Sequence, residues 1–337
     1  MTKATFPTFT PPGPDTIPSG GRNPSLADRF LAVPFSLLDA RTGWWRDRKA
    51  AWLATGIQSE LGRSDRLLYP TSAQPPATYA AKNAYEAALG RKATWAEFAQ
   101  AHPDKIRHQG TSVFDPVLCE LVYRWFSAPG HLVLDPFAGG SVRGIVAAAT
   151  GRAYAGLDLR AEQVQANRAQ WAALGQPGMP APRWVQGDAL AVRQALPEVQ
   201  ADLLFSCPPY GNLERYSDDE ADLSTMRYPR FLQTYRQIIK ESVALLRPDR
   251  FACFVVGDFR DTRGLQRGFV GDTIAAFRDA GAQLYNEAIL VTSAGSLPIR
   301  AGKAFEVSRK LGRTHQQVLV FVKGDARRAT AACGAVR

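Results

Sequence analysis

The chain has 337 residues, and 45% of them are hydrophobic. This is enough for a large core, and we expect one main domain of about 200–230 residues with smaller attachments. The formal net charge of +10 allows a polyanionic partner, although an ordinary basic protein has the same charge. The cysteines are scattered without a C-x-x-C pair, which argues against a disulfide framework and a zinc site and is typical of a reducing cytosol. We predict no metal site.

The sequence contains no signal for membrane insertion. No apolar stretch approaches the ~18–20 residues that span a bilayer. The first twenty residues, MTKATFPTFTPPGPDTIPSG, lack the apolar core of a signal peptide. We therefore predict a cytoplasmic protein without a membrane partner.

The N-terminal third falls into two predicted parts. Residues 1–30 are rich in Pro, Thr, Gly and Ser, and we predict a disordered tail. Residues 31–109 are predicted to form a helical extension, with helices over 44–53 and 80–102. The first of these helices mixes tryptophans with arginines and a lysine, which suits packing and also suits DNA contact.

Residues 110–325 alternate between apolar strands and amphipathic helices. This alternation predicts an α/β domain with a doubly wound, mostly parallel sheet. No clear helix separates the last two strands, which predicts a C-terminal antiparallel hairpin at one edge. Residues 326–337 are predicted to be a ragged tail. The expected strands are 131–135, 153–159, 183–186, 201–207, 250–259, 283–293 and 316–324.

A glycine turn closes the first of these strands. Asp135-Pro136-Phe137-Ala138-Gly139-Gly140-Ser141 lets the backbone approach a ligand closely in front of a helix N-terminus. Dinucleotide-binding enzymes use related turns. The complete word resembles motif I of the amino-group DNA methyltransferases, D-P-F-x-G-[ST]-G, although Gly140-Ser141 here replaces Ser-Gly or Thr-Gly. The resemblance implies a Rossmann-like class I methyltransferase fold and a loop that binds the methionine part of S-adenosylmethionine.

Three further acidic positions follow from the same resemblance. Asp158 ends the second strand, where a carboxylate accepts hydrogen bonds from ribose hydroxyls or caps a helix. Asp188 follows the third strand, where it contacts the adenine amine or forms a turn. Phe114 and Asp115 resemble the motif that completes the methionine pocket, but Asp115 also suits a helix cap before Pro116.

The most specific feature is the word Ser206-Cys207-Pro208-Pro209-Tyr210 at the end of the fourth strand. Ligands bind at this edge in doubly wound sheets. The word resembles motif IV, [DNS]-P-P-[YFW], of enzymes that methylate exocyclic amines of adenine or cytosine. In that family the first side chain and a proline carbonyl accept hydrogen bonds from the amine, and the aromatic ring stacks on the flipped base.

The departure from motif IV concerns its first residue. Cys207 replaces Asp, Asn or Ser, and a thiol is a weak acceptor. Ser206 is adjacent and can take this role after a small shift. Alternatively, Cys207 attacks carbon 6 of a pyrimidine and activates carbon 5. The carbon-5 enzymes carry a Pro-Cys word that this chain lacks, so the amine interpretation leads.

The resemblance extends beyond the motifs. From about Pro34 to Lys323 the chain is similar to DNA methylases of bacteriophages and prophages, on blocks that include WWRDRKAAWLATGIQSELGR, GTSVFDPVLCELVYRWF and SLPIRAGKAFEVSRKLGRTHQQVLVFVKGD. This implies a phage-type DNA-modifying enzyme. An RNA methyltransferase is a further alternative, because related words serve RNA enzymes.

A basic segment lies between the last two predicted strands. Residues 298–315 carry one acidic residue, Glu306, among five basic ones. We predict phosphate contacts for this segment, with a solvated loop as the alternative. The predicted DNA-binding residues are Arg300, Lys303, Arg309, Lys310 and Arg313.

Overall fold

The computed structural model describes residues 25–58, 76–102, 105, 114–211, 216–217, 219–295 and 297–336. The chain divides into two compact units. The sheet unit comprises Met1–Gly62, Phe114–Ser293 and Thr314–Arg337, and the helical unit comprises Arg63–Val113 and Ala294–Arg313. Each unit is described by itself.

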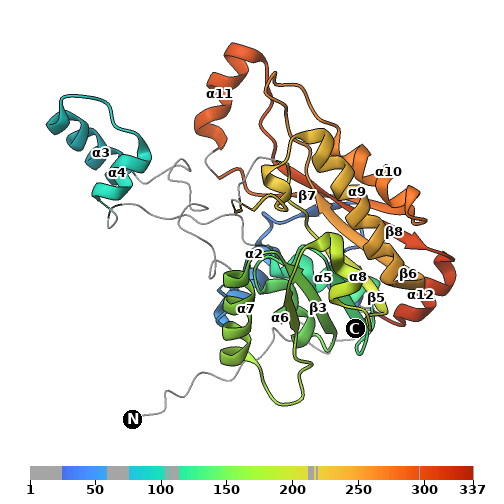
Figure 1. Cartoon of the computed structure of the whole chain (residues 1–337). Coiled ribbons are helices and arrows are strands. Elements are labelled where there is room, and N and C mark those ends of the chain that lie inside the picture. The colour runs from blue at the N-terminus through green and yellow to red at the C-terminus, as the bar shows by residue number, and fades with distance from the viewer. Residues whose placement is uncertain are drawn as a thin grey trace, which may run out of the picture. The chain divides into compact units, whose positions relative to one another are not determined.

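The sheet unit is built on an eight-stranded sheet with the order β1-β7-β8-β6-β5-β2-β3-β4 (Figure 1). Neighbouring strands are parallel except that β8 is antiparallel to both β6 and β7. This is the arrangement of a Rossmann-like class I methyltransferase, so the predicted fold is confirmed. The strands are β1 (Leu37–Asp39), β2 (Leu132–Asp135), β3 (Ala153–Asp158), β4 (Arg183–Gln186), β5 (Ala201–Ser206), β6 (Leu246–Val256), β7 (Gln283–Val291) and β8 (His315–Lys323).

Helices cover both faces of the sheet, because alternate residues of a buried strand point to opposite sides. In β6, Phe251 contacts Phe126, whereas Phe254 contacts Phe277. Helices α2, α5, α6 and α12 accordingly pack among themselves on one side, and α8, α9 and α10 on the other. The helices of this unit are α1 (Leu26–Phe30), α2 (Gly43–Ala54), α5 (Pro116–Phe126), α6 (Val142–Ala149), α7 (Ala161–Leu174), α8 (Val192–Ala195), α9 (Tyr228–Leu245), α10 (Phe269–Asp279) and α12 (Ala326–Cys333), with short 3₁₀ turns at Ala189–Ala191 and Leu223–Thr225.

The predicted pairing of the last two strands is confirmed, but two details differ. A helix, α11 (Leu297–Ser308), lies between β7 and β8 in the sequence. In addition, β1 pairs with the last three residues of β7, so β7 is not the outermost strand along its whole length. The sequence pattern concealed the helix, because Pro298 and Gly302 are poor helix formers in a stretch of basic residues.

Both predicted tails contain ordered structure. Residues Ala326–Cys333 form α12 and not a ragged end, because Asp325 caps the helix and Ala329 and Cys333 are buried one turn apart. Residues Leu26–Phe30 form α1, and the Trp125 indole donates a hydrogen bond to the Phe30 carbonyl at 2.8 Å. The rest of the predicted N-terminal tail, residues 1–24, lies outside the described residues.

The first helix of the predicted extension belongs to the sheet unit. Trp45, Arg48 and Trp52 are buried where α2 packs against α5. Arg48 donates two hydrogen bonds, at 2.6 and 2.7 Å, to the buried carboxylate of Glu120, and the Trp52 indole donates a third at 2.9 Å. The tryptophans at 45 and 52 therefore pack, and the structural grouping differs from the predicted boundary at residue 110.

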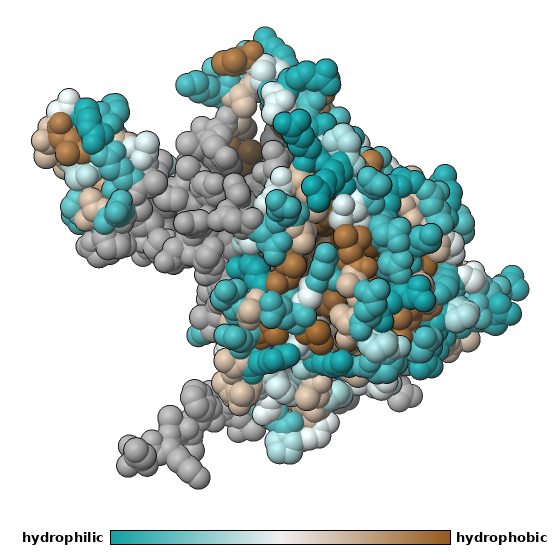
Figure 2. Space-filling model, in the orientation of Figure 1, coloured by the Kyte–Doolittle hydropathy of each residue, from teal (hydrophilic) through white to brown (hydrophobic). Residues whose placement is uncertain are grey.

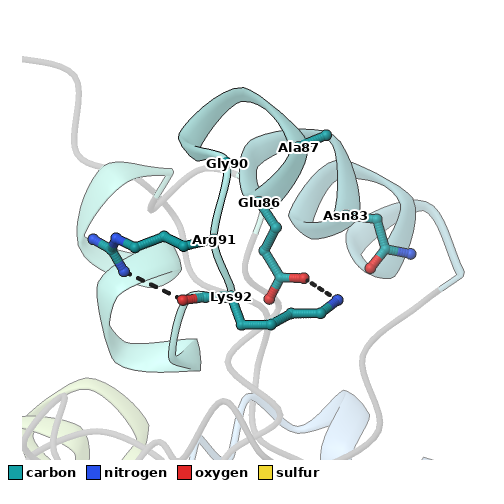
Figure 3. A pocket seen from close by; sticks show the side chains of 6 residues that line it. All are labelled: Asn83, Glu86, Ala87, Gly90, Arg91 and Lys92. Carbon is teal, nitrogen blue, oxygen red and sulfur yellow. Dashed lines mark hydrogen bonds and ion pairs between the residues drawn. The ribbon is translucent and has the colours of Figure 1, made fainter.

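The helical unit contains α3 (Pro76–Leu89), α4 (Trp95–Ala101) and α11. A shallow hollow of about 570 Å³ lies beside α3. Figure 3 shows the residues that line it, Asn83, Glu86, Ala87, Gly90, Arg91 and Lys92. Lys82 and Lys92 pair with Glu86 and lower its pKa to about 2. The only carboxylate that lines this hollow therefore stays ionised, and two lysines already balance its charge. We assign no ligand to the hollow.

Within the part of the chain that the structure describes, no helix is both long enough and apolar enough to cross a lipid bilayer.

Candidate cofactor and methyl-transfer site

The two motif loops leave neighbouring strands of the sheet. Strands β2 and β5 are parallel, with Val133 opposite Leu203 and Leu134 opposite Leu204. The loop after Asp135 and the loop after Ser206 therefore start side by side at the carboxyl edge. This is the edge at which doubly wound sheets bind ligands.

Asp135 connects these two loops. Its carboxylate is fully buried and accepts hydrogen bonds from the Phe137 backbone N–H at 3.1 Å and the Tyr154 hydroxyl at 2.7 Å. It also accepts bonds from Arg143 Nε and Ser206 Oγ, each at 2.5 Å. Motif I and motif IV therefore share one buried carboxylate.

Arg143 holds the backbone of the glycine loop through hydrogen bonds to its carbonyls. Besides its ion pair with Asp135, its Nη2 donates to the carbonyls of Phe137 and Ala138 at 2.5 and 3.0 Å. The guanidinium also lies 4.6 Å from the centre of the Phe114 ring. Burial alone would lower the pKa of Arg143, but the Asp135 carboxylate outweighs it and raises that pKa. Arg143 was not among the predicted site residues, although a cation in the first turn of an otherwise apolar helix was a signal for it.

The outer side of the glycine loop is held by β3 and α7. Gly139 has a φ of +50°, a conformation that favours glycine. Its N–H donates to Asp158 Oδ2 at 3.0 Å, and its carbonyl accepts from Asn167 Nδ2 at 2.7 Å. Ser141, the last residue of the motif, donates to Gln170. A buried polar stripe on α7, which the sequence analysis did not identify, therefore fixes this loop.

The residues predicted to contact the ribose and the adenine lie at the same edge of the sheet. Asp158 ends β3, and Asp188 follows β4. Asp158 accepts from the N–H groups of Gly139 and Arg160, and burial raises the pKa of its carboxyl. Asp188 caps the 3₁₀ turn after β4 by accepting from the Leu190 N–H at 2.9 Å. Their predicted roles toward a nucleoside stay predictions.

Asp115 acts as the cap of α5. It accepts hydrogen bonds from the Val117 N–H at 2.9 Å and the Trp45 indole at 3.2 Å, and it pairs with Lys49 at 3.0 Å. Of the alternatives for this carboxylate, the structure shows the helix cap. Residues 110–113 of the same motif lie outside the described residues.

In motif IV the serine and the cysteine have different environments. Ser206 is fully buried and its hydroxyl is engaged with Asp135, so it does not reach the open edge as an alternative acceptor. Cys207 is partly exposed, unlike the buried thiols of Cys119, Cys253 and Cys333. Its sulfur lies 3.4 Å from the Tyr210 hydroxyl. Cys207 is therefore the first side chain of the motif at the open edge.

Pro208 is buried and Pro209 is half-buried, so the two prolines lead from the buried strand to a partly exposed Tyr210. Burial raises the pKa of the Tyr210 hydroxyl, and the nearby Cys207 adds to this shift. The Tyr210 ring packs edge-on to Phe269, with centres 6.4 Å apart. Gly211 follows with a φ of +55°, and a Cβ there would lie 2.7 Å from the Phe259 ring. Glycine is thus required directly after the motif.

The predicted DNA-binding residues lie in the helical unit. The side chains of Lys303, Arg309 and Arg313 are exposed and Lys310 is half-buried, whereas the side chain of Arg300 lies outside the described ones. Figure 2 shows hydrophobic residues beside hydrophilic ones on α11. The segment leaves β7 after Val291 and re-enters the sheet at His315, which pair at the carboxyl edge of β7.

The described residues contain no group of three or more His, Cys, Asp or Glu side chains that could hold a metal ion.

Comparison with solved structures gives methyltransferases of low sequence identity. A methyltransferase from Pyrococcus furiosus is 15% identical over 74% of this chain and 100% of its own, with a TM-score of 0.44. An S-adenosylmethionine-dependent methyltransferase from Methanosarcina mazei is 12% identical over 60% and 97%, with a TM-score of 0.41. A putative methyltransferase from Bacillus halodurans is 12% identical over 63% and 99%, with a TM-score of 0.43. No family model and no curated protein sequence matches the chain.

Proposed function

We propose that this chain is an S-adenosylmethionine-dependent DNA methyltransferase that modifies an exocyclic amine, N6 of adenine or N4 of cytosine. The observation that supports this most is the junction of the two motif loops. They leave adjacent parallel strands, and Asp135 and Ser206 join them through a buried hydrogen bond. A cofactor held by one loop and a base held by the other would meet at this edge.

The glycine loop suits the proposed cofactor. A Cβ built on Gly139 would have no neighbour closer than 4.0 Å, so this part of the backbone faces open space. The loop would hold the methionine part and Asp158 the ribose, while Asp188 would contact the adenine. The bound sulfonium supplies an electrophilic methyl group. Arg143, Asn167 and Gln170 keep the loop in place, and this preorganisation lowers the entropic cost of transfer.

Motif IV would hold the base. The ring of Tyr210 offers a stacking surface, and a proline carbonyl orients the amine so that its lone pair faces the methyl group. The amine proton leaves to solvent after transfer. Cys207 contributes at most a weak hydrogen bond to this orientation.

The direct test uses unmethylated bacterial genomic DNA and S-adenosylmethionine with a tritiated methyl group. We expect tritium in the DNA and, after digestion, N6-methyladenine or N4-methylcytosine by mass spectrometry. A 5-methylpyrimidine would replace the amine proposal by the carbon-5 alternative. Transfer to RNA alone would replace DNA as the substrate, and transfer to neither would refute the proposal.

Substitution distinguishes the two possible roles of Cys207, orienting group and nucleophile. If an amine is the target, we expect Cys207→Ser to keep substantial activity, because it restores a familiar S-P-P-Y word. If Cys207 is a nucleophile, the serine variant would lose turnover, since an unactivated hydroxyl is a much poorer nucleophile than a thiolate.

A duplex that contains 5-fluorocytosine gives an independent reading of the same question. A nucleophilic cysteine would be trapped in an adduct that survives denaturing electrophoresis, whereas direct transfer to nitrogen leaves none. An adduct that forms with the wild type and is absent from Cys207→Ser would overturn the amine proposal. Cys253→Ser, which changes a buried thiol of β6, controls for loss of a cysteine elsewhere.

DNA binding is expected to depend strongly on salt and to use the segment around Arg309 and Lys310. Each lost phosphate contact lowers the slope of log K against log salt by about 0.9 on duplex DNA. The double variant Arg309→Ala/Lys310→Ala should therefore reduce the slope by up to about 1.8. Fluorescence anisotropy at several salt concentrations measures this change.

The matched control is Lys240→Ala/Arg327→Ala. Both side chains are exposed. Lys240 lies in the second half of α9, which ends at the amino end of β6, and Arg327 lies in α12, which follows the end of β8 at that same edge. This control should keep the wild-type slope. Equal slopes for the two double variants would remove the α11 segment from the DNA contact.

A further inference from the structure

We propose that Gln316 is a positioning residue for the flipped base, because it fixes the ring of Tyr210 through the tyrosine hydroxyl. This inference rests on the proposed function and concerns the same site. Gln316 lies 106 residues after Tyr210 and is not one of the site residues predicted from the sequence.

The contact is direct and has a defined polarity. The amide nitrogen Nε2 of Gln316 donates to the Tyr210 hydroxyl oxygen at 2.7 Å. The Tyr210 hydroxyl in turn donates to the Val255 carbonyl of β6, with the two oxygens 3.3 Å apart. Gln316 and Val255 both belong to the sheet, so these two bonds attach the far end of the tyrosine to the rigid part of the fold.

The direction of β8 explains why Gln316 reaches motif IV. Because β8 is antiparallel to β6, the first residues of β8 lie at the carboxyl edge, where Gln317 is opposite Val256. The same edge carries the loop that follows β5. A parallel last strand would bring its final residues, and not Gln316, to this place.

The other contacts of Tyr210 come from the hydrophobic core and from neighbouring loops. Gly257 lies beside the ring with no side chain, since a Cβ there would be 3.7 Å from Tyr210 Cε2. Phe269 touches the ring edge-on, and Cys207 lies beside the hydroxyl. The hydrogen bond from Gln316 adds to these contacts and holds the hydroxyl end of the ring in place. A stacking surface held at one angle favours the productive orientation of the amine.

A double-mutant cycle tests this inference. The variants are Gln316→Met, which keeps the length of the side chain without a donor, Tyr210→Phe, which removes only the hydroxyl, and the combination. We expect each single variant to lower kcat/KM for DNA by about fivefold to tenfold, as one net hydrogen bond allows. The double variant should fall no further than Tyr210→Phe, because both changes break the same contact.

Affinity for S-adenosylmethionine, measured by calorimetry, distinguishes positioning of the base from a general structural role. It should stay within about twofold of the wild type in all variants, since the glycine loop is held by other residues. The matched control is Gln283→Met, at an exposed position on β7 at the opposite edge of the sheet. It should change neither kcat/KM for DNA nor the affinity for S-adenosylmethionine.

Three results would overturn the inference. Losses that multiply in the double variant would show that Gln316 acts independently of Tyr210. A parallel loss of cofactor affinity would show a structural role. A wild type that transfers no methyl group to DNA would refute the proposed function as well, whereas the first two results leave that function intact.

Discussion

Replacing Arg143 with methionine is expected to lower the free energy of unfolding by about 3–5 kcal/mol, since removal of one partner leaves a buried charge unpaired. The side chain of Arg143 is only 5% exposed, and Asp135 beside it is fully buried. The same substitution releases the carbonyls of Phe137 and Ala138 and thereby loosens the glycine loop. We therefore also expect S-adenosylmethionine to bind about tenfold or more weakly, equivalent to about 1.4 kcal/mol or more.

Arg152→Met is the matched control for this prediction. Arg152 is also buried, but it donates to the carbonyls of Tyr123 and Ser127 at the amino edge of the sheet. Its loss should destabilise the fold without a specific effect on cofactor affinity. Urea denaturation measures stability, and calorimetry under conditions where both variants are folded measures affinity. Equal cofactor affinity in the two variants would contradict the role of Arg143 in the loop.

Replacing Glu120 with alanine is expected to cost about 3–5 kcal/mol of stability, because it leaves the buried guanidinium of Arg48 without a carboxylate. Glu120 also accepts from the Trp52 indole and from Arg124 Nε at 2.8 Å, so a single substitution removes four hydrogen bonds. Helix α2 would lose these polar contacts with α5 and keep those of Trp45 and Lys49 with Asp115. Urea denaturation measures the change.

Glu198→Ala provides the comparison. Glu198 pairs with Arg183, and both side chains are at least half exposed. Exposed ion pairs contribute about 1 kcal/mol or less, so this variant should be nearly as stable as the wild type. Similar losses in the two variants would show that the Arg48–Glu120 pair adds no more than a surface contact.

The sequence allowed the α/β class, the parallel order of most strands and the positions of both motif loops to be predicted. The reason is local: strand periodicity, a glycine turn and the word C-P-P-Y are all contained in short stretches of the chain. The same local reasoning failed at Ser206, for which a small shift toward the base was considered. The hydroxyl is fully buried against Asp135, and only the packing of β5 against β2 reveals this.

Local patterns also failed where a segment depends on a distant partner. The C-terminal residues 326–337 have a composition typical of a tail, yet Ala329 and Cys333 are buried as α12 packs against β6. Similarly, the tryptophans of α2 suited a DNA surface, but Trp45 and Trp52 are buried and their indoles donate to Asp115 and Glu120, respectively. In both cases burial against another element, and not intrinsic preference, stabilises the helix.

The sequence by itself determined that a cofactor-type glycine loop and a C-P-P-Y word end buried strands. Only the tertiary structure decided which side chains connect them: Arg143 beneath the loop, Asp135 shared by both motifs, and Gln316 on the hydroxyl of Tyr210. The last two connections join residues 71 and 106 positions apart. Contacts at such separations depend on strand order and direction, and above all on the antiparallel β8 beside β6, which no short stretch of sequence specifies.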